Sequence, residues 1–303
     1  MAAGAAIGLT TPSTPFAELS RAGAAAGLPE SAAVMAQAQT ENFPVASRLL
    51  PRRIRSQLLA LYGFARLVDD AGDESAGDRL ALLDEIEADL GRAFTGVARQ
   101  PLLAQLQPTI TECQLPIEPF RRLLEANRRD QVKHRYETFE ELLEYCTLSA
   151  NPVGELVLGV FAAATPDRIV LSDAVCSGLQ LVEHWQDVAE DYARDRIYLP
   201  AADRRPLGVT EGDLALAAPT TELRQLLKLE VGRARALLDQ GAPLIGTLPG
   251  RRGLAVALFV AGGRSALKAI ERADYDVLSM RPRPTRGLRI TELLATLVGR
   301  PGR

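Results

Sequence analysis

Two pairs of aspartates in this chain are spaced for binding metal ions. Asp69 and Asp73 are four residues apart, and so are Asp187 and Asp191. Residues four apart lie on one face of an α-helix, where like charges repel, so each pair destabilises its helix unless a cation lies between the carboxylates. Two such pairs facing one cavity would hold divalent ions and a diphosphate, which points to the chemistry of prenyl diphosphates.

The first pair has a phenol and a guanidinium beside it. If the stretch is helical, Tyr62 and Arg66 share one side of the helix with Asp69 and Asp73. The carboxylates of this stripe can bind a magnesium ion, while the guanidinium of Arg66 can bind phosphate oxygens. The alternative is a solvated face on which Arg66 pairs with Asp69 or Asp70, since exposed ion pairs are common and weak.

The second pair also lies beside polar and basic residues. In a helix that ends near residue 191, one side carries Gln180, Glu183, Asp187 and Asp191. Arg196 and Tyr198 follow the helix, where they could cover a bound anion. Two acidic stripes, each with an arginine and a tyrosine nearby, favour a site for metal and diphosphate over two unrelated solvated faces.

Composition limits the classes of protein to which this chain can belong. With 303 residues, of which 47% are hydrophobic and 24% charged, it can bury a sizeable core in one large domain or two small ones. The net charge of −3 and the lack of a basic run argue against a nucleic acid partner. Three scattered cysteines and two histidines argue against a disulfide framework, a zinc site or a histidine-based triad.

The sequence favours a cytoplasmic location. The cysteine usage suggests a reducing compartment, and the N-terminal residues lack the basic and apolar regions of a signal peptide. The longest apolar runs, 156–164 and 254–260, are well short of the roughly 20 residues that span a bilayer. We expect any membrane contact to be peripheral, and association with neighbouring pathway enzymes stays open.

The acidic stripes need helices to hold them, and helical periodicity dominates the chain from Pro44 onward. Apolar residues recur at intervals of three and four, and no run alternates with the period of a strand. We therefore expect an all-α fold with one helical bundle around a central cavity. Residues 1–38 are expected to form a poorly ordered tail, 39–280 the helical domain, and 281–303 an extension with a short helix. The expected helices are 52–68, 78–94, 101–106, 119–130, 139–148, 153–164, 173–191, 223–241, 253–278 and 290–298.

These residues resemble the motifs of the squalene and phytoene synthase family. The first family motif, Y-x-x-x-R-x-x-D-D-x-x-D, is matched by Tyr62, Arg66, Asp69, Asp70 and Asp73. The second, Q-x-x-x-x-x-x-D-x-x-x-D followed by R-x-Y, is matched by Gln180, Asp187, Asp191, Arg196 and Tyr198. A Tyr-Cys pair before a helix of small residues is matched by Tyr145 and Cys146. The likeness runs from about residue 41 to residue 278 and implies an isoprenoid synthase-like bundle.

Three segments are similar to the bacterial hydroxysqualene synthases of hopanoid pathways within this family. They are 41–47 (ENFPVAS), 149–154 (SANPVG) and 185–188 (WQDV). The resemblance implies magnesium-dependent conversion of presqualene diphosphate to hydroxysqualene, with loss of diphosphate, capture of water and no use of NADPH. One alternative is head-to-head condensation of two farnesyl diphosphates to presqualene diphosphate or squalene. Another is a non-catalytic family member that acts as a binding or assembly protein.

The resemblance also implies roles for the polar residues of both motifs. The expected magnesium ligands are Asp69, Asp73, Asp187 and Asp191. Glu183 stands where the family usually has Asn, and we keep it as a further metal ligand. Substrate binding is assigned to Arg66, Arg196 and Gln180, and the phenols of Tyr62 and Tyr198 are expected to donate hydrogen bonds or to face a carbocation.

Three other positions have a functional and a structural interpretation. Phe43 and Tyr145 could line the cavity and stabilise positive charge through their rings, or they could be ordinary core residues. Asn151 could orient the attacking water, or it could cap the helix that begins at Pro152. His184 is expected to pack beside Trp185, with a base role as the alternative. The charged segment 128–136 is typical of a solvated face, although it could also contact diphosphate.

Overall fold

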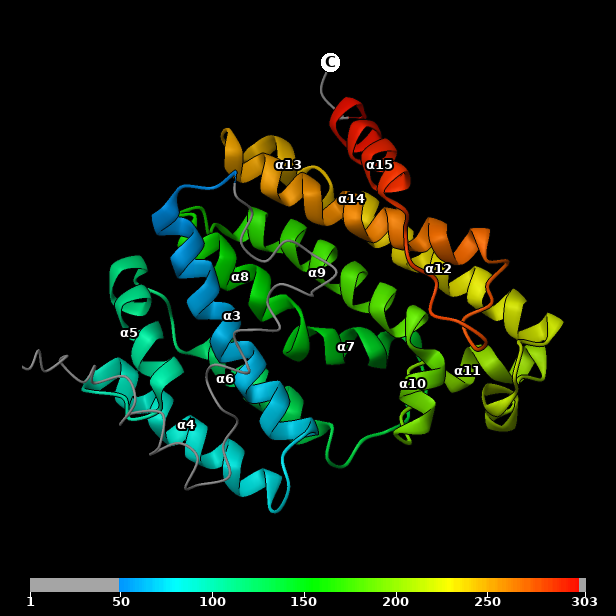
Figure 1. Ribbon diagram of the computed structural model, residues 1–303, viewed down its shortest axis with the longest axis horizontal. Coiled ribbons are helices and arrows are strands. Elements are labelled where there is room, and N and C mark those ends of the chain that lie inside the picture. Colours follow the sequence, from blue (N-terminus) through cyan, green and yellow to red (C-terminus); the bar gives the residue numbers. More distant parts are fainter. Residues whose placement is uncertain (1–48, 300–303) are drawn as a thin grey trace, which may run out of the picture.

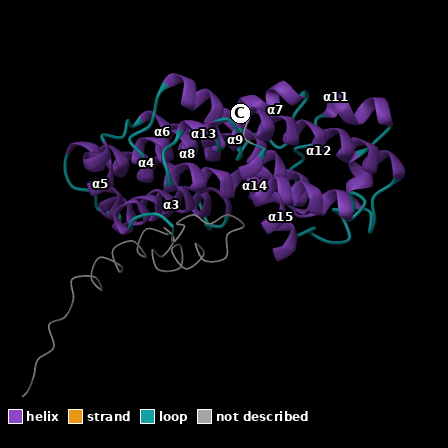
Figure 2. Cartoon of the chain, turned by 90° about the horizontal axis from the view of Figure 1, so that it is seen from above, coloured by secondary structure: helices purple, strands orange, loops and turns teal. Residues whose placement is uncertain are grey.

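The computed structural model describes residues 49–299, and helices are the regular secondary structure of this part of the chain (Figures 1 and 2). The expected all-α single domain is therefore confirmed. The expected tail 1–38 and Phe43 lie outside the described residues. The helices are α3 (Arg52–Asp73), α4 (Arg79–Thr95), α5 (Pro101–Cys113), α6 (Glu118–Arg129), α7 (Phe139–Ser149), α8 (Asn151–Val160), α9 (Pro166–Gln186), α10 (Val188–Ala193), α11 (Ala201–Arg204), α12 (Thr221–Gly241), α13 (Leu244–Thr247), α14 (Arg251–Arg272) and α15 (Arg286–Val298), with short 3₁₀ turns η1 (Arg205–Leu207) and η2 (Glu211–Ala215).

Local sequence explains where several of these helices begin. Side chains cap the first turns of five of them. Asp78 before α4, Thr138 before α7, Thr220 before α12 and Thr285 before α15 each accept a hydrogen bond from a backbone N–H three residues on, and Gln100 caps α5 in a similar way. Proline occupies the first turn of α5, α8 and α9, where its missing N–H costs nothing. Because Thr285 caps α15, that helix begins at Arg286, four residues before the expected start.

Several expected helix boundaries are wrong: α5 runs to Cys113 instead of ending at residue 106, and two expected helices are interrupted. The chain does not run as one helix over 173–191: α9 ends at Gln186, Asp187 has φ −107° and ψ 15°, and α10 begins at Val188. The expected helix 253–278 ends at Arg272, because Asp274 and Tyr275 adopt positive φ angles of 52° and 59° that interrupt a right-handed helix. The break at Asp187 changes the geometry of the second acidic pair.

The long helix α9 runs through the middle of the molecule and organises the rest (Figure 1). It packs against α12 and α14 on one side and against α7 and α8 on the other. Two hydrophobic clusters form the core. One contains Phe64 and Phe120, whose rings meet edge to face at 5.1 Å, and the other contains Trp185 and Leu226. The candidate site lies where these clusters meet.

One described helix, α14, is long and apolar enough to cross a membrane by length and composition. However, 67% of its most apolar window is buried inside the protein. Burial of this extent is typical of the core helix of a soluble protein. We therefore treat α14 as part of the core, where it supports α15 and α9.

Candidate active site

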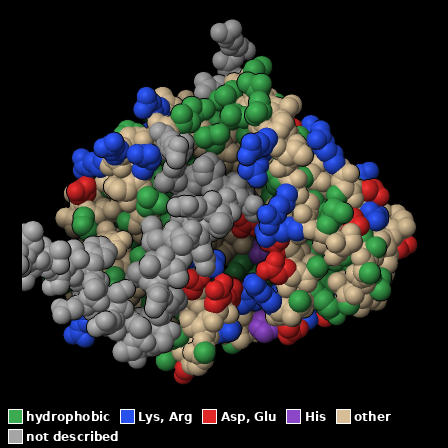
Figure 3. Space-filling model, in the orientation of Figure 1, with side chains coloured by type: hydrophobic (Ala, Val, Ile, Leu, Met, Phe, Trp, Pro, Cys, Tyr) green, Lys and Arg blue, Asp and Glu red, His purple; other side chains and the backbone are tan. Residues whose placement is uncertain are grey.

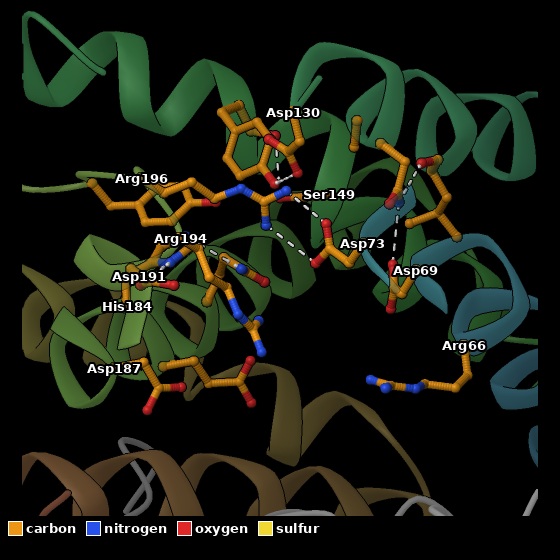
Figure 4. A pocket seen from close by; sticks show the side chains of 17 residues that line it. Arg66, Asp69, Asp73, Asp130, Ser149, His184, Asp187, Asp191, Arg194 and Arg196 are labelled. Carbon is orange, nitrogen blue, oxygen red and sulfur yellow. Dashed lines mark hydrogen bonds and ion pairs between the residues drawn. The ribbon is translucent and has the colours of Figure 1, made fainter. Parts of the chain in front are cut away.

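A polar cavity of about 260 Å³ lies between α3, α6 and α7 on one side and α9, α10 and the following loop on the other (Figure 4). Every predicted site residue in the described part of the chain lines this cavity, except Tyr62 and Asn151. Aspartates of α3 lie on one wall and aspartates of the α9–α10 junction on the opposite wall, as Figure 4 shows. The fold therefore brings together two groups of residues that are far apart in the sequence.

The α3 wall presents Arg66, Asp69 and Asp73 to the cavity. Arg66 is held on its own helix, with Nε 2.7 Å from Asp70 Oδ1 and Nη2 2.9 Å from Glu74 Oε1. The ion pair of Arg66 with Asp70 that the sequence left open is therefore present, but on a side chain that still borders the cavity. The Asp69 side chain is exposed to the cavity, and the surrounding protein raises its pKa, against the lowering effects of a hydrogen bond from Asn127 and the charge of Arg66.

Asn127 is a site residue that sequence reasoning missed. Its amide Nδ2 donates to Asp69 Oδ1 at 3.2 Å, from α6. Close approach of α6 to α3 depends on Gly72, because a Cβ added there would be 2.3 Å from Asn127 Oδ1. The glycine inside the first acidic motif thus makes room for the residue that orients the first aspartate, and only the pairing of the two helices reveals it.

On the opposite wall, Asp187 and Asp191 lie on either side of the break between α9 and α10. Burial raises the pKa of Asp187 to about 6 and that of Asp191 to about 7, and the charge of Asp187 adds to the shift at Asp191. Asp191 Oδ2 is buried without a hydrogen-bond donor. Buried carboxylates with raised pKa values and an unsatisfied oxygen are groups that a bound cation would stabilise.

Two arginines form ion pairs with aspartates of the two motifs. Arg196 reaches across the cavity to Asp73, with Nη2–Oδ1 and Nη1–Oδ2 distances of 2.6 and 3.1 Å. Arg281, from the segment after α14, makes a similar pair with Asp187 at 2.5 Å (Nε–Oδ1) and 2.6 Å (Nη2–Oδ2). The motifs did not identify Arg281. Each acidic pair therefore has one carboxylate neutralised by a guanidinium from another segment.

The carboxylates fit magnesium only in partnership with a phosphate ligand. Among the described residues, no three acidic, histidine or cysteine side chains converge on a point that could hold an ion. Magnesium is commonly bound through one or two carboxylates, with phosphate oxygens and water completing its six ligands. The all-oxygen donor set and the unsatisfied Asp191 oxygen match this mode of binding, in which a diphosphate supplies the missing ligands.

Backbone contacts hold the segment that carries Arg196 and Tyr198 against the segment before α7. The Ile197 N–H donates to the His134 carbonyl at 2.9 Å, and the Ala201 N–H donates to the Tyr136 carbonyl at 3.0 Å. Arg135 adds a 2.7 Å ion pair with Asp195, which adopts a left-handed φ of 61°. The charged segment 128–136 is thus a scaffold for the second motif as well as a surface.

Aromatic rings and an aspartate line the cavity beside Arg196. Tyr198 stacks on His184 with ring centroids 3.6 Å apart, and the Tyr145 hydroxyl donates to Asp130 Oδ2 at 2.6 Å. Burial lowers the pKa of His184 to about 3, so its imidazole is neutral, and raises the pKa of Asp130 to about 6. Sequence reasoning did not single out Asp130 within the charged segment 128–136. It expected His184 to pack beside Trp185, although His184 shares the helical stripe of Gln180 and Asp187 and lines the cavity.

The remaining predicted residues have different positions. Gln180 and Glu183 line the cavity on α9. Tyr62 is half-buried on α3 and is not among the lining residues. Asn151 is buried in the first turn of α8, where its Oδ1 accepts a 2.9 Å hydrogen bond from Ser177, and α8 has no side-chain cap. The capping interpretation of Asn151 is therefore wrong, and its catalytic role stays a prediction.

Comparison with known proteins identifies similar sequences and folds. The family model for squalene/phytoene synthase matches residues 36–289. A hydroxysqualene synthase of Rhodopseudomonas palustris is 36% identical over 240 residues, covering 77% of this chain and 80% of the relative, and one of Zymomonas mobilis is 34% identical over 244 residues, covering 78% and 80%. A phytoene synthase of Arthrospira platensis is 32% identical, covering 80% and 83%.

Solved structures extend the comparison to the fold. The squalene synthase HpnC from Alicyclobacillus acidocaldarius superposes with a TM-score of 0.75 at 45% identity, covering 83% of this chain and 93% of that one. A dehydrosqualene synthase in complex with a ligand gives a TM-score of 0.81 at 23% identity, covering 94% and 99%. The isoprenoid synthase-like bundle expected from the sequence is confirmed.

Proposed function

Because the chain belongs to the squalene and phytoene synthase family, we propose that it converts presqualene diphosphate to hydroxysqualene, releasing diphosphate and adding water. The observation that carries the proposal is the pairing, across one cavity, of two acidic pairs with Arg66 and Arg196. The hydroxysqualene synthases at 34–36% identity support the choice of reaction. Both expected acidic motifs are intact, which disfavours a non-catalytic binding or assembly protein.

The cavity residues suit the departure of a diphosphate. Asp69, Asp73, Asp187 and Asp191 would hold magnesium, which would neutralise the charge that grows on the leaving group. Arg196 would exchange Asp73 for phosphate oxygens, and Arg66 would add a second guanidinium from α3. A charged guanidinium aimed at the leaving oxygens lowers the barrier because the charge there is larger in the transition state than in the substrate.

The second half of the reaction needs a controlled supply of water. The carbon–oxygen bond to diphosphate breaks with its electron pair on oxygen, and a water molecule then forms the new carbon–oxygen bond and loses a proton. Tyr198 lines the cavity, and its aromatic ring would stabilise the carbocation. The released diphosphate is a base close enough to accept the proton.

A second function has its own support. The HpnC structure at 45% identity is named a squalene synthase, and the phytoene synthase relative is 32% identical. Condensation of two farnesyl diphosphates would use the same acidic pairs and arginines. The two functions differ in the substrate that is consumed, since the first begins from presqualene diphosphate and the second makes it.

The test supplies the two substrates separately, with magnesium and without NADPH. We expect purified protein to release diphosphate and form hydroxysqualene from presqualene diphosphate, and to leave farnesyl diphosphate unchanged. Consumption of farnesyl diphosphate would replace the first function by the second. No turnover of either substrate would favour the binding or assembly protein.

A further inference from the structure

The last helix presents an apolar stripe outward. In α15, Ile290, Leu294 and Val298 have exposed fractions of 60%, 58% and 85%, and their spacing of four residues places them on one face. The opposite face packs on α14 through Leu288, which is 4% exposed. An apolar outer face on a helix that already has an inner packing face lacks the polar surface expected of a solvated helix.

This stripe differs from the other exposed apolar side chains. In the rest of the described chain, large exposed hydrophobic residues occur singly on different elements, as at Leu80, Val97 and Val170. Single exposures of that kind are normal for a protein surface. Three on one face of one helix form a contiguous patch, which marks an interaction surface.

The charge around the stripe is basic, although the whole chain carries a net charge of −3. Residues 281–298 contain four arginines and one carboxylate. Glu292, the carboxylate, pairs with Lys268 of α14 at 3.0 Å, and Arg281 pairs with Asp187. The other three arginines, Arg283, Arg286 and Arg289, are exposed. The partner of this face therefore carries negative charge together with an apolar layer.

The apolar stripe of α15 lies on the side of the molecule at which the cavity opens. Figure 3 shows apolar side chains gathered over α15 near the C-terminus, basic side chains below them, and then a hollow bordered by acidic side chains. Figure 1, in the same orientation, shows α15 at the edge of the molecule, packed only along its inner side. A flat partner that contacts α15 would therefore face the opening of the cavity.

We propose that α15 docks the protein on the surface of an anionic phospholipid bilayer. Ile290, Leu294 and Val298 enter the region between headgroups and acyl chains, and Arg286 and Arg289 contact lipid phosphates. The reason for docking rests on the proposed function, since a prenyl substrate and product are soluble in lipid rather than in water. A single short helix of this kind binds weakly and reversibly, and its electrostatic part is screened by salt.

Sedimentation with lipid vesicles tests the proposal without reference to catalysis. We expect the full chain to bind vesicles of phosphatidylcholine and phosphatidylglycerol more tightly than vesicles of pure phosphatidylcholine. Arg286→Gln with Arg289→Gln should weaken binding to the anionic vesicles by about fivefold per arginine. Ile290→Ser with Leu294→Ser should weaken it at least about tenfold.

A matched control uses the same residue types far from α15. Val97→Ser with Arg99→Gln alters an exposed valine and an exposed arginine in the loop between α4 and α5 and should leave binding unchanged. Equal loss in the control and in the α15 variants would overturn the proposal, as would failure of the natural chain to bind anionic vesicles. So would a dimer in light scattering that the Ile290→Ser and Leu294→Ser pair dissociates, because a second copy would then cover the stripe.

The two proposals fail separately. Turnover of presqualene diphosphate in detergent micelles reports the reaction without a bilayer, and the α15 variants should retain it. If the natural chain turns over presqualene diphosphate but does not bind vesicles, only the docking proposal fails. Vesicle binding without turnover of presqualene diphosphate leaves the docking surface in place and removes the proposed reaction.

Discussion

At the scale of single residues, two arginines pair with acids that magnesium would need. Arg196 holds Asp73 and Arg281 holds Asp187. A diphosphate can attract both guanidinium groups and so release the carboxylates for metal binding. Binding of metal and of diphosphate should therefore favour each other, since coupling between two ligands is reciprocal.

Removing one acidic ligand tests the metal assignment. Asp73→Ala should lower the turnover number at least about a hundredfold, because it removes a carboxylate ligand and the partner of Arg196 together. Circular dichroism should show an unchanged helical content. Asp84→Ala is the matched control, since Asp84 pairs with an arginine outside the cavity. Full activity of Asp73→Ala would contradict the assignment.

The raised pKa values predict a dependence of stability on pH. Burial raises the pKa of Asp191 to about 7, above the ordinary value of an aspartate, and the protein around the exposed Asp69 side chain raises its pKa in the same direction. Between about pH 4 and pH 7 the folded protein then binds more protons at these groups than the unfolded chain, so their contribution to stability is lost as the pH rises through that window.

The measurement is the melting temperature with EDTA and with magnesium. Without metal, it should fall between pH 5 and pH 8, and Asp69→Asn with Asp191→Asn should flatten the fall. Magnesium should raise the melting temperature more at pH 8 than at pH 5, since only ionised carboxylates bind it. An increase with pH in the metal-free protein would contradict the raised pKa values.

At the scale of elements, the sequence predicted the acidic stripe of α3 because one uninterrupted helix carries the whole motif. It did not predict the break at Asp187, since no glycine or proline stands there and the local pattern continues as a helix. Asn127, Asp130 and Arg281 were missed for a different reason. They come from α6 and from the segments after α6 and α14, and only tertiary packing brings them to the cavity.

The approach of α6 to α3 can be tested at Gly72. A Cβ there would overlap Asn127 Oδ1, so Gly72→Ala should destabilise the protein by about 1–3 kcal/mol and disturb the hydrogen bond to Asp69. Gly91→Ala on α4 is the control, because nothing lies within 4 Å of its new methyl group. That change should leave stability equal or raise it by about 0.4–1 kcal/mol. If Gly72→Ala and Gly91→Ala changed the free energy of unfolding in urea equally, the close approach of α6 to α3 at Gly72 would not contribute to stability.

The segment after α14 is tested at Arg281. Arg281→Gln should strengthen manganese binding to the free protein, because it removes a guanidinium that competes with the metal for Asp187. Isothermal titration calorimetry without diphosphate measures this directly. Arg283→Gln changes an exposed arginine of the same segment and should bind manganese as the natural chain does. Weaker binding by Arg281→Gln would mean that the arginine supports the metal site instead.

At the scale of the whole molecule, helical periodicity was enough to predict an all-α domain with a central cavity. It could not predict that the two acidic pairs face each other across the cavity, because that depends on how α3 packs relative to α9 (Figure 4). Family motifs supplied the expectation, and the fold places the residues accordingly. The outward face of α15 also emerges only from the packed structure, where Leu288 points inward and Ile290 outward.

The proposed function stands on one distinction, which is between consuming presqualene diphosphate and making it. The most direct measurement is product analysis after purified protein is incubated with presqualene diphosphate and magnesium in the absence of NADPH. The proposal predicts hydroxysqualene and an equal amount of released diphosphate. Recovery of unchanged presqualene diphosphate, with farnesyl diphosphate consumed in the parallel incubation, would contradict it.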